Sequence, residues 1–167
     1  MRIGIWLTEG AWPAAVDAAA EWQDDASEVV LLHVAGGGAA EVVGGAYGGL
    51  WGRGRRRDPA ASLAAEAGTA STELLERAAA RLGRPCQLRS LGGRPERAVT
   101  AAADALDLLV VARDGDLSRL GPRSLGPETR FVVDHAPCRV LLVWPGTAPG
   151  LGSIPPPPAG PPEPDRR

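Results

Sequence analysis

The sequence predicts a single α/β domain built on a doubly wound, open parallel sheet. The clearest sign is the stretch Asp107–Trp144, whose pattern indicates an apolar strand, a loop rich in glycine and arginine, a helix and a second apolar strand. The two strands of this unit, Leu108–Val111 and Val140–Val143, are continuous apolar runs, which are typical of parallel strands covered on both faces. Segments of strand and helix type also alternate along the chain, and this alternation predicts parallel strands joined by helical crossovers.

The first half of the chain supplies two strands and two helices of this pattern. Ile3–Leu7 and Glu28–Val34 are the first and second predicted strands. Between them, Trp12–Trp22 is predicted to form a helix, because Pro13 suits its first turn and its small apolar residues form a stripe. Ala60–Leu82 has a strongly helical composition, and the Gly-Arg-Pro sequence that follows is typical of a helix end.

The second half supplies the third strand and the remaining helices. Cys86–Leu91 is a weaker strand in which the polar residues Gln87 and Arg89 alternate with apolar ones, a pattern that favours an edge of the sheet. A helix is predicted over Pro95–Leu106, with proline at its first position. The last helix is predicted to begin at Pro127, ahead of the final strand.

Two segments lie outside this pattern. Ala35–Pro59 is too rich in glycine for a regular element, and a loop of this length is usually either functional or disordered. It contains a basic run, Arg53–Arg57, for which two interpretations remain, a site for a polyanion such as RNA or DNA and a solvated loop. The expected domain therefore spans residues 1–145, followed by a proline-rich tail, 146–167, that we expect to be disordered or polyproline-like.

The composition limits the classes of function. The formal net charge is −2, so nothing in it demands nucleic acid or a membrane surface as a partner. Cys86 and Cys138 show neither a metal-site nor a disulfide spacing, and we expect them to be buried, reduced thiols. The amino terminus lacks the apolar core of a signal peptide, and no segment has the roughly 20 apolar residues of a membrane span, so a cytoplasmic location is expected.

The loop after Leu108–Ala112 is the predicted ligand site, because ligands of open α/β sheets bind at the carboxyl edge of the strands. Glycines in this loop allow backbone amides to approach a phosphate closely, and nearby arginines can hold phosphates through their guanidinium groups. Pro127 and Glu128 oppose such binding, since the first lacks an amide and the second would repel a phosphate. A tight connector with solvated arginines is the alternative interpretation. The residues of this predicted site are Arg113, Gly115, Arg119, Gly121, Arg123, Gly126 and Arg130.

Three segments, in their order and spacing, resemble the universal stress protein family. They are EVVLLHV, GGRPERAVTAAADALDLLVVARDGD and HAPCRVLLV, and the resemblance covers Met1–Pro145. It implies a flavodoxin-like, Rossmann-like fold, in which three layers surround a five-stranded sheet of order 3-2-1-4-5. It also implies dimerisation through the last strand and, as in many members, ATP bound between strands one and four.

The ATP-binding pattern of that family is matched only in part. The pattern consists of an aspartate at the end of strand one and, after strand four, Gly-x2-Gly-x9-Gly-Ser/Thr. Thr8 stands in place of the aspartate, Ala112 replaces the first glycine, and Gly115 matches the second. Gly126 follows after ten residues instead of nine, and Pro127 replaces the serine or threonine. The resemblance carries a phosphate-binding role to the two glycines only.

The resemblance predicts a non-enzymatic stress-response module that binds an adenine nucleotide, ATP, ADP or AMP, with Val34 beside the adenine. Magnesium is expected only together with the nucleotide, and no other metal site is predicted. The expected assembly is a homodimer through Val140–Trp144. Two alternatives remain, a dimeric interaction protein that binds no nucleotide and a slow nucleotide hydrolase, which is disfavoured because no poised base or nucleophile is evident. His33, inside an apolar strand, is interpreted as a hydrogen-bonded core residue.

Overall fold

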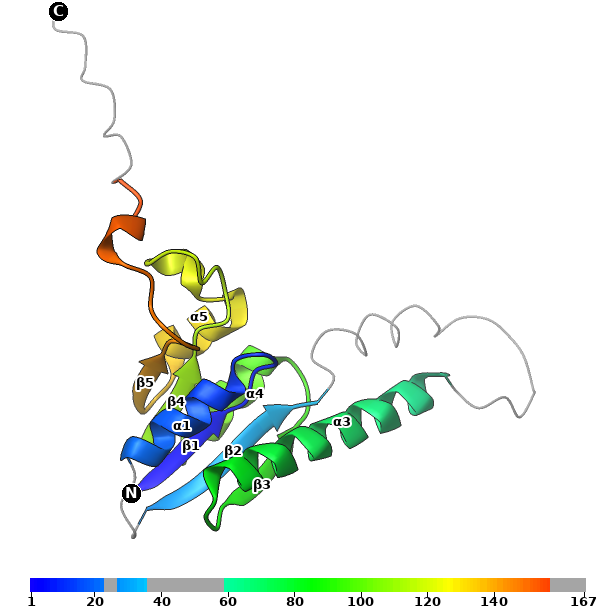
Figure 1. Ribbon diagram of the computed structural model, residues 1–167. Helices are drawn as coiled ribbons and strands as arrows, with labels where there is room; N and C mark the ends of the chain where they lie inside the picture. Colours follow the sequence, from blue (N-terminus) through cyan, green and yellow to red (C-terminus); the bar gives the residue numbers. More distant parts are fainter. Residues whose placement is uncertain (23–26, 36–58, 157–167) are drawn as a thin grey trace, which may run out of the picture.

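A computed structural model gives the fold of the chain and describes residues 1–22, 27–35 and 59–156 (Figure 1). Our predictions for the basic run Arg53–Arg57 and for the last part of the proline-rich tail lie outside the described residues. Five parallel strands form one sheet in the order β3-β2-β1-β4-β5, which confirms the predicted order. The strands are β1 (Arg2–Trp6), β2 (Glu28–Val34), β3 (Gln87–Leu91), β4 (Leu108–Ala112) and β5 (Arg139–Val143).

Helices cover both faces of the sheet, so the fold has three layers (Figure 1). One apolar cluster joins α1 and α3 to one face, and a second joins α4 and α5 to the other. Each face of the sheet therefore has its own core, as expected for a doubly wound fold. The helices are α1 (Trp12–Trp22), α3 (Pro59–Leu82), α4 (Pro95–Ala103) and α5 (Pro127–His135), with short 3-10 helices η1 (Pro122–Ser124) and η2 (Leu151–Ser153).

The burial of each strand follows its position in the sheet. Every residue of β4 is buried, because β4 has a strand on each side and helices on both faces. β3 lies at one edge, as its alternating polar residues predicted, and it is mostly exposed. β5 forms the other edge, where its apolar residues remain only half-buried. The apolar side chains of β5 thus keep part of their surface exposed in a single chain.

Helix α4 is shorter than the sequence predicts, because it ends at Ala103 and not at Leu106. The chain turns after Ala103, and the amide of Leu106 donates to the carbonyl oxygen of Ala103 at 3.0 Å. The Leu106 side chain then fills the space beside Gly4 of β1, where an added Cβ would overlap it. The helix therefore ends early, because Leu106 packs against β1 at Gly4, where the strand has no side chain.

Beyond β5, the described part of the proline-rich tail contains the 3-10 helix η2. It contacts the loop that follows β4, since the amide of Leu120 donates to Ser153 Oγ at 3.1 Å. Both cysteines are free thiols and half-buried. None of the described helices combines the length and the apolar character that a membrane span requires.

Candidate functional site

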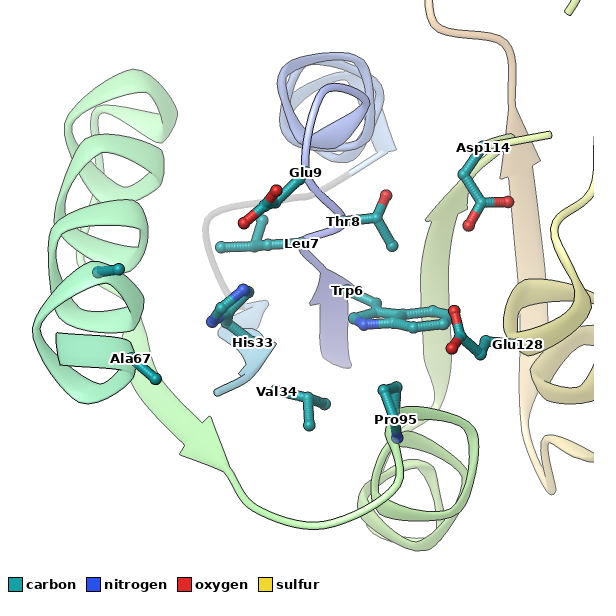
Figure 2. Close-up of a pocket in the computed structure, with 11 residues that line it drawn as sticks. Trp6, Leu7, Thr8, Glu9, His33, Val34, Ala67, Pro95, Asp114 and Glu128 are labelled. Carbon is teal, nitrogen blue, oxygen red and sulfur yellow. The ribbon is translucent and has the colours of Figure 1, made fainter. Parts of the chain in front are cut away.

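A cavity of about 520 Å³ opens at the carboxyl edge of the sheet, where β1, β2 and β4 end (Figure 2). Its volume lies within the range of roughly 300–1,000 Å³ that is typical of small-molecule sites. Residues from six segments line it: the end of β1, the end of β2, helix α3, the start of α4, the loop after β4 and the start of α5. The lining residues are Trp6, Leu7, Thr8, Glu9, His33, Val34, Ala67, Ala70, Pro95, Asp114 and Glu128.

One side of the cavity is apolar. Figure 2 shows Val34 and Pro95 together on this side, and the indole of Trp6 lies between them and the loop after β4. Trp6 is itself only 3% exposed, so it is a rigid part of the wall. Val34 therefore lies in a place that suits an aromatic ring of a ligand.

Thr8 lines the same cavity and carries a buried, unpaired hydroxyl group. Its Oγ1 is buried and has no hydrogen-bond partner among the described residues. The carbonyl oxygen of Thr8 accepts the amides of Ala11 at 3.2 Å and Trp12 at 3.0 Å, which holds the turn into α1. A buried hydroxyl without a partner is unfavourable by about 1–3 kcal/mol. The oxygen has almost no exposed surface, so a ligand in the cavity would reach it only after the Thr8 side chain rotates.

His33 faces the cavity from β2 and belongs to a chain of hydrogen bonds. Its Nδ1 lies 2.8 Å from Ser71 Oγ, which lies 2.9 Å from Ser90 Oγ. Burial lowers the pKa of His33, and the nearby carboxylate of Glu9 opposes this shift. The imidazole is therefore neutral at pH 7. The hydrogen bond predicted for His33 is present. The sequence did not predict that the ring lies in the cavity wall. The position of His33 near the end of a strand was the only indication of this.

Asp114 caps the start of helix α5. One carboxylate oxygen, Oδ1, accepts the amide of Gly126 at 2.8 Å, and the other accepts the hydroxyl of Thr129 at 2.6 Å. Free amides at the start of a helix are where an anion would bind, and here a side chain of the protein takes that place. The sequence analysis did not select Asp114. In the sequence it is only an acidic residue between the two candidate site residues Arg113 and Gly115. The two residues that it binds lie 12 and 15 positions farther along the chain.

The glycines of the loop make close contacts within the loop itself. The amide of Gly115 donates to the carbonyl oxygen of Ser124 at 3.0 Å, and a Cβ at Gly115 would lie 2.8 Å from two neighbouring carbonyl carbons. Gly121 has a φ of 116°, a conformation that favours glycine. The amide of Gly126 is bonded to Asp114. Gly115 and Gly126 thus use their amides inside the protein.

The arginines near this loop are absent from the lining of the cavity. The guanidinium of Arg113 lies over Trp144 and donates to Ser124 Oγ, while Arg119 pairs with Asp116 at 2.8 Å. Arg130 donates to the carbonyl oxygen of Pro122. Two further predicted residues, Ala112 and Pro127, also lie outside the lining of the cavity. Ala112 is fully buried in β4, and Pro127 is the first residue of α5. Arg123 is exposed.

The structure therefore brings only part of the predicted site together. Thr8 and Val34 share the cavity, whereas the predicted glycines and arginines lie outside its lining. Three carboxylates complete the wall instead, those of Glu9, Asp114 and Glu128. Figure 2 shows Glu128 reaching toward Trp6 from the α5 side and Glu9 on the side of His33. In the described part of the chain, no group of three or more His, Cys, Asp or Glu residues could hold a metal ion.

Comparison with protein families identifies the chain. The sequence profile described as "Universal stress protein family" matches residues 4–143, most of the chain. The chain belongs to the universal stress protein family. No curated protein matches it at a significant level.

Solved structures support this assignment at the level of the fold. A hypothetical protein, solved as a test case of structural genomics, is similar to this universal stress protein with a TM-score of 0.66 and 17% identity, over 88% of this chain and 97% of its own. A universal stress protein in complex with cAMP has a TM-score of 0.57 and 20% identity, over 87% and 98%. A family member from Arabidopsis thaliana with AMP bound has a TM-score of 0.53 and 18% identity, over 93% and 95%. The flavodoxin-like fold predicted for the chain is confirmed.

The cavity of this universal stress protein suits the nucleoside part of an adenine nucleotide and does not suit its phosphates. The apolar wall around Val34 and Pro95 and the ring of His33 suit a nucleoside. The phosphates do not fit, because Asp114 takes the amide of Gly126 and no arginine in the described part of the chain lines the cavity. Repulsion from the carboxylate of Glu128 adds to this misfit.

Proposed function

We propose that this universal stress protein is a non-enzymatic regulatory module that binds the adenosine part of an adenine ligand in the cavity at the carboxyl edge of β1, β2 and β4. The observation that carries the proposal is the cavity itself, whose volume suits a nucleoside and whose wall combines the apolar Val34 and Pro95 with the ring of His33. Rotation of the Thr8 side chain would bring its buried, unpaired hydroxyl to a ligand hydroxyl or ring nitrogen, and this pairing would remove the unfavourable free energy of leaving it without a partner.

The remaining wall supplies complementary groups for a nucleoside. Val34 and Pro95 offer apolar contact for a ring, and His33, held neutral by burial, offers a hydrogen bond. Its Nδ1 is engaged with Ser71, so Nε2 is the ring nitrogen left for a ligand. Apolar contact with a few placed polar groups is the usual composition of a small-molecule site.

Binding without turnover is proposed because the serine–histidine pair at the cavity wall cannot act on a substrate. Ser71 contacts His33, but it is fully buried in the packing of α3. A hydroxyl without exposed surface cannot attack a substrate, so this pair orients the imidazole of His33 and does not form a nucleophile. Neighbours solved with cAMP and AMP support the choice of an adenine ligand.

Calorimetric titration with adenosine tests this function. We expect binding that weakens about tenfold in Thr8→Val, because the variant keeps the shape of the side chain and loses its hydrogen bond. Thr72→Val is the matched control, since the Thr72 hydroxyl is bonded to the carbonyl oxygen of Gly68 on the exposed side of α3. Absence of heat with adenosine, AMP and ATP at millimolar concentration would contradict the proposal.

A second candidate function, an interaction module that acts as a homodimer, rests on β5. This edge strand carries four half-buried apolar residues in five, and its outer side has no neighbouring strand in the described part of the chain. Unpaired edges of this kind are the surfaces through which sheets extend between chains. We propose that a second copy covers it, along Val140–Trp144.

A further inference from the structure

The carboxylate of Asp114 lies where the protein would otherwise offer its best anion-binding groups. Gly126 stands at the N-cap of α5, and its amide donates to Asp114 Oδ1. The first residue of the helix, Pro127, has no amide to donate. Thr129, a buried hydroxyl in the first turn, donates to the second oxygen of Asp114. The start of α5 is thus already neutralised by a negative charge that belongs to the chain.

Two other carboxylates add negative charge to the same cavity. Glu128 follows Pro127 in the first turn of α5, and Glu9 follows Thr8 at the end of β1. Each of these groups would weaken the binding of a singly charged phosphate about fivefold, and that of a dianionic phosphate about thirtyfold, at roughly 4 Å even with the dielectric constant of water. Partial enclosure of the cavity would increase this repulsion.

Among the residues that the structure describes, no cation in the cavity wall offsets these charges. Arg119, the arginine closest in sequence after Asp114, is paired with Asp116. Arg113 is held over Trp144, and Arg130 is bonded to the carbonyl oxygen of Pro122. Three of the four guanidinium groups near this loop are therefore engaged in contacts within the loop and with Trp144, and the fourth, that of Arg123, is exposed and outside the lining of the cavity.

We propose that the cavity selects an adenine ligand without phosphate groups, an uncharged nucleoside, and that Asp114 is the residue that determines this selection. The inference rests on the proposed function and narrows its ligand class. Asp114 occupies the phosphate position at the start of α5, while the nucleoside part of the cavity stays open beside Thr8 and Val34.

The test is a calorimetric comparison of adenosine with AMP. In the unmodified protein we expect adenosine to bind at least tenfold more tightly than AMP. In Asp114→Asn, which keeps the size of the side chain and removes its charge, this ratio should fall by about fivefold or more. Asp134→Asn is the matched control, because Asp134 is exposed near the other end of α5 and lies outside the cavity, and its ratio should stay within twofold.

A second variant tests the effect of charge without altering the hydrogen bonds of Asp114 at the start of α5. Glu128→Gln removes a cavity charge without touching the hydrogen bonds of Asp114, and it should lower the adenosine-to-AMP ratio in the same direction. Salt gives an independent readout. AMP affinity should rise with ionic strength if repulsion limits it, and it should fall if arginines hold the phosphate.

The possible outcomes separate the two proposals. AMP binding as tightly as adenosine, or AMP affinity that falls with salt, would overturn the selection by Asp114 and leave the adenine-binding function standing. Failure of both ligands to bind would overturn the proposed function, and the selection with it. An unchanged ratio in both Asp114→Asn and Glu128→Gln would show that neither carboxylate determines the choice.

Discussion

The guanidinium of Arg113 lies over the ring of Trp144, with 4.7 Å between the Cζ atom and the ring centroid. The two residues directly follow β4 and β5, so their contact joins the ends of two neighbouring strands. Arg113 also donates to the buried hydroxyl of Ser124, which itself donates to the carbonyl oxygen of Gly121. A residue predicted to bind phosphate is therefore part of the internal structure of the loop.

Replacing Arg113 by alanine should destabilise the protein. Loss of the contact with Trp144 and of the hydrogen bond to Ser124 should lower the free energy of unfolding by about 1–2 kcal/mol. The decrease is no larger because the buried Nε of Arg113 has no partner, which already offsets part of the stability that these two contacts contribute. Chemical denaturation followed by circular dichroism measures this change. Arg123→Ala, at an exposed position, serves as control and should stay within about 0.5 kcal/mol. Equal stability of the two variants would contradict a structural role for Arg113.

Gly115→Ala should disturb the loop by steric overlap. An added Cβ would overlap the carbonyl oxygen of Arg123, and backbone atoms cannot move aside as a flexible side chain can. The expected decrease in the free energy of unfolding is about 1–3 kcal/mol. Gly92→Ala is the matched control, because a Cβ there would have no atom within 4 Å. A Gly115→Ala protein as stable as the control would show that the loop can rearrange.

The stability of the protein should fall as the pH drops below about 6.5, the ordinary pKa of histidine. Burial lowers the pKa of His33, so the folded chain binds this proton less readily than the unfolded chain does. The contribution of His33 is therefore fully present above pH 6.5 and is lost as the pH falls through the folded-state pKa. Melting temperatures between pH 5 and 8 measure it.

The two histidines of the chain provide the comparison for this pH effect. His33→Gln should flatten the melting-temperature profile, because the amide cannot take up a proton and can still pair with Ser71. His135→Gln should leave the slope in place, since His135 is exposed at the end of α5. The same slope in the wild type and in His33→Gln would assign the effect to other groups.

Dimerisation through β5 predicts a different response to proline and to alanine at Leu142. The carbonyl oxygen of Val143 accepts the amide of Arg113 at 2.9 Å, so by alternation the backbone groups of Leu142 point away from β4. Leu142→Pro should yield a monomer, because it removes an outward amide, whereas Leu142→Ala should remain dimeric. Sedimentation velocity distinguishes the two states. A monomeric wild-type protein would refute the dimer.

Much of the fold could be predicted from local patterns. The continuous apolar run of β4 predicted a strand covered on both faces, and β4 is fully buried. Polar Gln87 and Arg89 predicted an edge for β3, and the sheet places it there. The end of α4 was wrong by three residues, because Leu106 packs beside Gly4, more than a hundred positions earlier in the chain.

The sequence by itself determined the class of the fold, the order of its elements and the edge of the sheet at which a cavity forms. Those features follow from apolar periodicity and from resemblance to a family, which are properties of local segments. Tertiary structure decided the chemistry of the site. Asp114 binds a helix start that lies 12 to 15 residues away, and Arg113 turns toward Trp144 instead of the cavity. Contacts between residues this far apart depend on where the whole chain places them, and a local pattern does not contain that information.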